Sequence, residues 1–253
     1  MQTLDIKNDG AIRTITLNRP DALNALNAQM TDDLTDAFLQ ASEASSVKVV
    51  VLTGAGKAFW AGADLKEMGN PNLNPKHTFA DMLDAILDCP KPFIIAVNGV
   101  GVGIGATICG LADMVVISED AKLRCPFSSL GLTAEAASTY TFPRLMGHQK
   151  ASWFLLSGEW MNAQQCVETG LAMEKISPNN LLEHTYTLAQ SLADLPTSSL
   201  QTTKNLLRYT DKTSIKAAIK QENKGLADLA GSAANKEALA AFRDKRPPNF
   251  SNL

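Results

Sequence analysis

Two short segments combine small residues with the end of an apolar run, a setting in which the main chain itself can do chemistry. The first is KAFWAGADLKEM at 57–68, and the second is NGVGVGIGA at 98–106. Each is typical of a strand end that passes into a helix start, where backbone N–H groups have no intrahelical partner. Two such donors aimed at one oxygen would stabilise a developing oxyanion. Glycine clusters after strands also serve turns and packing, so the spacing by itself leaves both interpretations open.

The second segment supports a competing interpretation as well. Gly101, Gly103 and Ala106 match the dinucleotide-binding pattern G-x-G-x-x-A, and Glu119 follows at a suitable distance. This match would indicate a nucleotide-dependent dehydrogenase. It leaves the first segment unexplained.

A third segment carries a carboxylate in apolar surroundings. Residues 125–138, CPFSSLGLTAEAAS, hold Glu135 among small and apolar neighbours. Thr133 as a helix N-cap and Glu135 as a first-turn acid are typical of an ordinary helix start. A carboxylate in such surroundings is also a candidate base with a raised pKa.

The elements that must position these segments are short strands alternating with helices. The patterns predict strands at 3–7, 11–17, 47–52, 93–97 and 114–117, and helices at 27–42 and 78–87. Residues 69–76 are rich in turn formers and predict a surface loop. Beyond residue 179 apolar stripes at helical spacing predict an almost wholly helical region. The alternation favours an α/β class with crossover connections.

Composition excludes several functional classes. Of 253 residues 45% are hydrophobic and 19% charged, and the net charge is −3, so we expect a globular protein with no nucleic-acid partner. Four dispersed cysteines and three histidines lack the spacing of a zinc site, and we expect no metal and a reducing compartment. Residues 94–112 are apolar but broken by glycines, and the N-terminus lacks the apolar stretch of a secretory signal. We therefore expect a cytoplasmic protein with no membrane association.

Together these segments resemble the crotonase superfamily, also called the enoyl-CoA hydratase/isomerase family. The likeness covers nearly the whole chain and includes LNRP at 17–20, AGADLKEM at 61–68, KPFIIAVNG at 91–99 and AFRDKRPPNF at 241–250. The resemblance implies an α/β fold, a crotonase-type spiral of repeated ββα units at 1–195 that carries the acyl-CoA site. A helical C-terminal region at 196–253 would serve oligomerisation and site closure. An acyl-CoA thioester would be the substrate, with no separate cofactor, and the assembly would be a homotrimer or a dimer of trimers.

The resemblance also implies roles for individual residues. The backbone N–H groups of Ala63 and Ile104 would form the oxyanion hole, with Ile104 standing where the family usually has glycine. The positions that would contact the substrate are Lys57, Ala61, Asp64, Leu65, Lys66, Phe127, Leu132, Phe242 and Lys245. Among these, the lysines and Phe242 match positions that hold the coenzyme A nucleotide, since phosphates attract cations and adenine accepts an aromatic face. Phe242 and Lys245 would lie on a helix that can belong to a neighbouring subunit.

Two departures separate the chain from the hydratases of this family. Those enzymes use two glutamates to activate water, and the matching positions hold Thr107 and Phe127. Residues 126–131, Glu135 and residues 138–143 are instead similar to 3,2-enoyl-CoA isomerases, which carry one catalytic glutamate at the place of Glu135. We therefore expect an isomerase that moves a double bond of an enoyl-CoA from C3 to C2 in fatty acid oxidation. A dienoyl isomerase, a thioester hydrolase and a non-catalytic acyl-CoA binding module are the alternatives.

Overall fold

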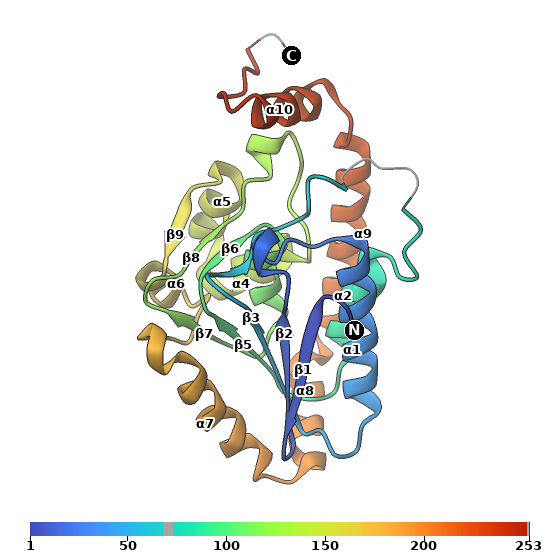
Figure 1. Ribbon diagram of the computed structural model, residues 1–253, viewed down its shortest axis with the longest axis vertical. Helices are drawn as coiled ribbons and strands as arrows, with labels where there is room; N and C mark the ends of the chain where they lie inside the picture. The colour runs from blue at the N-terminus through green and yellow to red at the C-terminus, as the bar shows by residue number, and fades with distance from the viewer. Residues whose placement is uncertain (68–72, 252) are drawn as a thin grey trace.

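The computed structural model describes residues 1–67, 73–251 and 253, and these form two sheets (Figure 1). The larger sheet has the order β1 (Leu4–Asp9), β2 (Ile12–Leu17), β3 (Val49–Gly54), β5 (Phe93–Val97), β7 (Met114–Ser118) and β10 (Glu174–Ile176). The smaller sheet has the order β4 (Ala58–Trp60), β6 (Val100–Val102), β8 (Lys122–Arg124) and β9 (Trp160–Asn162). The β1–β2 and β8–β9 pairs are antiparallel, and the other neighbouring strands are parallel.

From β3 to β8, consecutive strands alternate between the two sheets. β3 leads into β4, β5 into β6 and β7 into β8, and in each pair the first strand belongs to the larger sheet. A helical segment follows each pair. After the first two pairs the next strand lies in the larger sheet, and after β7–β8 the next strand is β9 of the smaller sheet. This repetition of ββα units confirms the predicted spiral fold.

The helices lie between these units and after them. Those within the spiral are α1 (Ala28–Glu43), α2 (Phe79–Asp88), α3 (Ile104–Thr107), α4 (Ser138–Met146), α5 (His148–Ser157), α6 (Ala163–Thr169) and α7 (Leu181–Ala193). Those at the C-terminal end are α8 (Thr197–Tyr209), α9 (Lys212–Leu229) and α10 (Ala233–Arg243). Short 3-10 turns lie at Pro20–Ala22, Ile108–Leu111, Ser128–Leu130 and Pro178–Asn180. None of the helices in the described ranges is both long and apolar enough to cross a membrane.

The larger sheet is covered on both faces, which explains the continuous apolar runs in its central strands. Val50 and Leu52 of β3 point into the main core, which also contains apolar residues of α1 and α2. Val49 and Val51 point to the opposite face and pack against α7. Alternate residues of one strand therefore serve two separate layers of side chains.

The predicted helices around the first segment are confirmed to within one residue. The side chain of Asn27 accepts a hydrogen bond from Met30 N–H and caps α1. Thr78 and Asp81 form a capping box at the start of α2. The loop predicted at 69–76 falls partly on residues 68–72, which lie outside the described residues.

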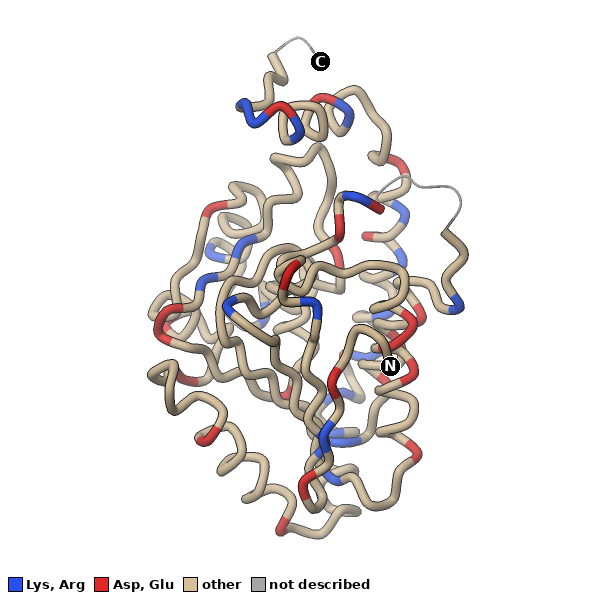
Figure 2. Tube along the Cα trace, viewed as in Figure 1, with Lys and Arg blue, Asp and Glu red and all other residues tan. Residues whose placement is uncertain are grey.

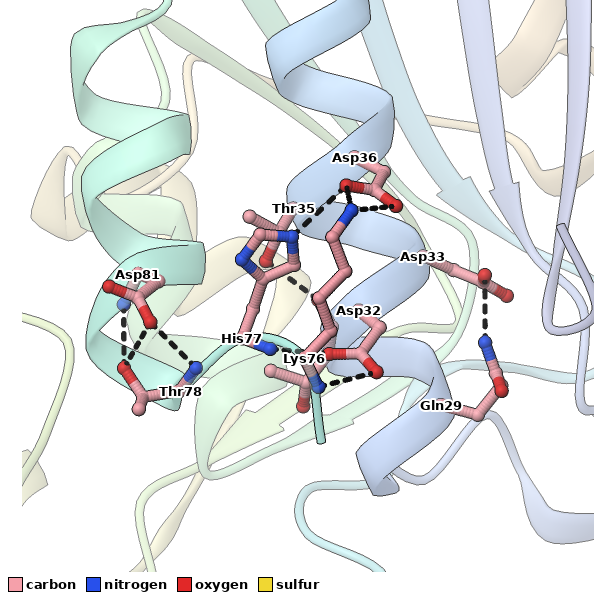
Figure 3. A network of polar contacts seen from close by, with 10 residues as sticks. Gln29, Asp32, Asp33, Thr35, Asp36, Lys76, His77, Thr78 and Asp81 are labelled. Carbon is pink, nitrogen blue, oxygen red and sulfur yellow. Dashed lines mark hydrogen bonds and ion pairs between the residues drawn. The ribbon is translucent and has the colours of Figure 1, made fainter. Parts of the chain in front are cut away.

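The chain that leads into α2 is attached to α1 by acidic side chains (Figure 3). Asp32 accepts hydrogen bonds from the backbone N–H groups of Lys76 and His77, at 3.0 and 2.7 Å. Asp36 contacts Lys76 Nζ at 2.7 Å and His77 Nε2 at 3.0 Å. These contacts fix the entry into α2 on the surface of α1.

Two predicted boundaries are wrong. Thr133 does not cap a helix, because Ala136 and Ala137 take left-handed backbone conformations and α4 begins only at Ser138. The region after β5, expected to be a glycine-rich turn, contains the strand β6. Gly99 allows this, because a side chain there would place Cβ 2.2 Å from the carbonyl oxygen of Lys57.

Candidate functional site

The turn that follows β4 is fixed by pairing with Leu26. Leu26 N–H donates to Gly62 O at 2.7 Å, and Asp64 N–H donates to Leu26 O at 2.8 Å. In this bridge the N–H of Ala63 points to the side away from Leu26. Ala63 is exposed, and its N–H donates no hydrogen bond within the described part of the chain. The first segment therefore presents a free main-chain donor. The helix start predicted after it is wrong, because residues 65–67 form a turn.

The second segment presents another such donor. Ile104 is the first residue of α3, so its N–H has no acceptor within the helix, and it has none elsewhere among the described residues. The preceding Gly103 has φ 54° and ψ −119°, a backbone conformation that residues other than glycine disfavour. A Cβ on Gly105 would lie 2.1 Å from the carbonyl oxygen of Trp60, so the start of α3 touches the end of β4.

Glu135 reaches the same place from a third segment. A methyl carbon built on Gly103 would lie 3.7 Å from Glu135 Oε1, 3.8 Å from Gly62 Cα and 3.9 Å from Phe127 Cε1. The carboxyl group therefore lies next to both turns that carry the free donors. The structure brings together the three segments that the sequence singled out.

The environment of Glu135 raises its affinity for a proton. Burial of the carboxyl group is the main cause that raises its pKa to about 8, and the negative charge of Glu222 adds to the effect. The residue as a whole keeps some solvent contact, and its carboxylate accepts no hydrogen bond from any described group. A carboxyl with a pKa near neutrality can both take and return a proton, which is what a general base that shuttles hydrogen requires.

The two positions that the family resemblance matches to the glutamates of hydratases, Thr107 and Phe127, carry no carboxylate. Thr107 is fully buried, and its hydroxyl donates to Gly103 O at 3.2 Å within the first turn of α3. Phe127 is 6% exposed, and its ring lies beside Gly103. This side of the site is therefore apolar.

A cavity of about 370 Å³ lies between the first segment and α10 of the same chain. Its lining residues are Leu65, Lys66, Lys236, Leu239, Phe242 and Arg243. The structure thus brings the predicted Leu65, Lys66 and Phe242 together. It adds two cations, Lys236 and Arg243, that sequence reasoning missed because the face that α10 turns to the site depends on packing. Lys and Arg alternate with acidic residues along α10 and the tail behind it (Figure 2).

The remaining predicted contact residues are more dispersed. Lys57 is exposed before β4 and Lys245 is exposed after α10, and neither is among the described residues that line this cavity. The carboxylate of Asp64 pairs with Arg19 at 2.9 Å and so stabilises the turn that contains Ala63.

Ala61 N–H donates to Leu23 O at 3.1 Å, and Leu132 N–H donates to Phe127 O at 2.9 Å. Their contacts with substrate stay predictions.

Known proteins are similar to this chain in sequence and in fold. Residues 7–252 match the family model described as enoyl-CoA hydratase/isomerase. The chain is 34% identical over 224 residues to enoyl-CoA delta isomerase 2 of Rattus norvegicus, with 86% of the chain but only 57% of that protein covered. It is 33% identical over 252 residues to 2,3-dehydroadipyl-CoA hydratase of Escherichia coli strain K12, with 99% of both covered.

A solved structure agrees with these relatives. The crystal structure of an enoyl-CoA hydratase/isomerase from Pseudoalteromonas atlantica T6c has a TM-score of 0.95 and 32% identity, and covers 98% of this chain and 100% of its own. The relatives include both an isomerase and a hydratase by name, so they assign a family rather than one reaction. The chain belongs to the enoyl-CoA hydratase/isomerase family, the crotonase superfamily.

Proposed function

We propose that this protein is a 3,2-enoyl-CoA isomerase of fatty acid oxidation. The observation that carries the proposal is one carboxyl group, Glu135, with a pKa of about 8, beside two turns with free main-chain donors. Thr107 and Phe127 stand where a hydratase needs its two glutamates.

The reaction would begin with binding of the thioester oxygen by Ala63 N–H and Ile104 N–H. Glu135, as carboxylate, removes a proton from C2, and the C–H electron pair moves toward the thioester and gives a dienolate with its negative charge on that oxygen. The two donors stabilise this charge, an effect worth about 10²–10³ in rate per donor. Glu135 then returns the proton to C4, and the double bond lies between C2 and C3. The proton removed from C2 is the proton added at C4, so the reaction as proposed needs no cofactor.

The apolar side of the site favours this reaction over hydration. Addition of water needs a group that activates a water molecule next to C3. The buried ring of Phe127 lies next to Gly103 and excludes water from that side. The hydroxyl of Thr107 already donates to Gly103 O. A neutral hydroxyl is also too weak a base to activate water at neutral pH.

The direct test is turnover of a small panel of thioesters by the purified protein. With 3-hexenoyl-CoA we expect formation of the conjugated 2-trans ester, and with 2-hexenoyl-CoA we expect no 3-hydroxyacyl product. Hydration of 2-hexenoyl-CoA without any shift of the double bond in 3-hexenoyl-CoA would disprove the proposal. Dienoyl and saturated esters in the same panel separate isomerisation from dienoyl isomerase and thioester hydrolase activities. Binding without turnover would identify a non-catalytic module.

The pKa of Glu135 predicts the pH dependence of turnover. Only the deprotonated carboxylate can accept the C2 proton, so kcat/KM should rise with pH and level off above about 8. A profile already flat from pH 5 upward would show that Glu135 is not the titrating base. Initial rates at saturating and subsaturating substrate, from pH 5 to 10, give the profile.

The cavity beside α10 would hold the nucleotide of coenzyme A, remote from the reacting carbons. Lys66→Met and Lys236→Met should each raise KM about two- to fivefold, the value of an exposed ion pair, with little change in kcat. The matched control is Lys7→Met, which removes an exposed lysine from β1. A fall in kcat at unchanged KM would contradict this placement.

The trimer or dimer of trimers stays a prediction that sedimentation can measure.

A further inference from the structure

The chain turns sharply immediately after Glu135. Ala136 and Ala137 have φ values of 54° and 58°, two left-handed non-glycine residues in succession. Each costs about 1–2 kcal/mol relative to ordinary backbone. Ala137 is also the N-cap of α4 and supplies no side-chain cap to its free N–H groups. Such a turn persists only if something outside it holds it in place.

Glu222 of α9 provides that support from a distant part of the sequence. Its Oε2 accepts a hydrogen bond from Ala137 N–H at 2.6 Å. Its Oε1 accepts from Thr139 N–H at 2.9 Å and from Thr139 Oγ1 at 2.6 Å. The side chain thus caps α4 and holds the second left-handed residue. Burial raises the pKa of Glu222, and the hydrogen bonds from Thr139 and Ala137 oppose this effect and favour the ionised carboxylate.

Glu222 is unusual for its own position on α9. It is 5% exposed and stands on the apolar stripe that includes Ile215 and Ile219. A buried charge on such a stripe costs free energy unless it is fully paired. Its three hydrogen bonds go to Ala137 in the turn that follows Glu135 and to Thr139 in the first turn of α4, so the buried charge stabilises this part of the chain.

In the described part of the chain, Glu222 is the charged group that acts on Glu135, and the other titratable groups nearby do not replace it. Cys125 also lies near Glu135, but burial raises the pKa of its thiol well above the usual value, so it stays neutral. The charged residues at the other end of α9 are engaged elsewhere. Asp211 pairs with Tyr140 and Arg144, and Lys212 and Lys216 pair with Asp88. Glu222 is therefore the negative charge that acts on the base.

We infer that Glu222 is a positioning residue for the reaction: it holds the left-handed turn that follows Glu135, so that Glu135 stays beside the turns with the free donors, and it places a fixed negative charge near Glu135. This role rests on the proposed function, in which Glu135 is the base. The charge of the side chain acts on the pKa of Glu135, and its length (its reach) allows the hydrogen bonds that hold the turn. Separate substitutions can remove the charge and shorten the reach.

The experiment compares three variants by difference infrared titration and by turnover. Glu222→Gln keeps the size and removes the charge, and Glu222→Asp keeps the charge and shortens the reach. Asp228→Asn, an exposed position on the same helix, is the control for charge. The protonated carboxyl band that disappears in Glu135→Gln reports the base directly, with no substrate present.

We expect the midpoint of that band to move from about 8 toward 4.5 in Glu222→Gln, but not all the way, because burial is the larger cause of the raised pKa. The midpoint should not move in Asp228→Asn. Glu222→Asp should keep most of the midpoint and lose about 10- to 100-fold in kcat, the typical cost of a misplaced catalytic group. Ala137→Gly should restore part of this loss, because glycine adopts the turn without support.

Each outcome bears on one proposal. An unchanged midpoint in folded Glu222→Gln overturns the role of the charge, and wild-type kcat in Glu222→Asp overturns the role of the reach. If Glu222→Gln does not fold, kcat of Glu222→Asp with and without Ala137→Gly tests the positioning role: a loss that Ala137→Gly does not restore at all overturns it. If the wild-type protein fails to isomerise 3-hexenoyl-CoA while the infrared midpoint still moves, the proposed function falls and the link between Glu222 and Glu135 stands.

Discussion

Glu135→Gln should lower kcat for 3-hexenoyl-CoA isomerisation by about 10²–10⁴, the usual contribution of a general base. Glutamine has nearly the same shape as glutamate, so the fold and the binding of acyl-CoA should persist. The loss should appear in kcat and kcat/KM alike, because proton removal occurs only in the transition state. Steady-state rates on the purified variant, with circular dichroism as the check on folding, measure the effect.

The control for this variant is Glu119→Gln, an exposed glutamate in the turn after β7. It should retain wild-type rates. Activity of Glu135→Gln within a few-fold of wild type would remove Glu135 from the mechanism, although the other parts of the site could still bind coenzyme A esters.

The same substitution should change how stability depends on pH. The pKa of Glu135 is raised from 4.5 to about 8 on folding, so between these values the folded state binds more protons than the unfolded state. The stabilisation from this group is complete below pH 4.5 and is lost as pH rises through 8. The free energy of unfolding of Glu135→Gln should therefore fall less steeply than that of wild type over this range, as urea titrations at several pH values can show.

Gly103→Ala should cost about 10²–10³ in kcat, the value of one oxyanion donor. The backbone of Gly103, at φ 54° and ψ −119°, is one that alanine disfavours, and relaxation would rotate the peptide that carries Ile104 N–H. The added methyl would also lie 3.7 Å from Glu135 Oε1, in the space that the proposed mechanism gives to the substrate. Turnover of 3-hexenoyl-CoA and the thermal unfolding midpoint should be measured together.

Gly10→Ala is the matched control for Gly103→Ala. Gly10 has the same φ of 54° in the turn between β1 and β2, and a Cβ there meets nothing within 4 Å. Both variants should lose stability through backbone strain, but only Gly103→Ala should lose activity. Equal retention of activity in both would show that the donor at Ile104 is not needed.

The names of the relatives leave the reaction open, and the proposed reaction rests on individual side chains. A hydratase and an isomerase match this chain at 33% and 34% identity. The proposal depends on three positions: Thr107 and Phe127 have no carboxylate that could activate water, and Glu135 has one that would act on carbon. Overall identity averages over hundreds of positions and is insensitive to these few.

Much of the fold and part of the site follow from local sequence. The strands near residues 11–17, 47–52 and 93–97 and the two capped helices before residue 90 appear close to where periodicity predicts them, because alternation and capping are properties of neighbouring residues. The two segments rich in small residues also indicate by themselves where the main chain can expose N–H groups. Local patterns thus determine the elements and the list of groups able to react.

Tertiary structure alone decides which of these groups meet and how they behave. Thr133 has the features of a helix cap, yet the helix begins at Ser138, because Glu222 in α9 holds Ala137 in a left-handed conformation that no local rule favours. The pKa of Glu135 depends on the same distant carboxylate and on burial, and Lys236 reaches the cavity beside Lys66 only through the packing of α10. Sequence periodicity reports on neighbours within a few residues. Electrostatics and strain depend on distances in space between segments that the sequence separates by 80 residues or more.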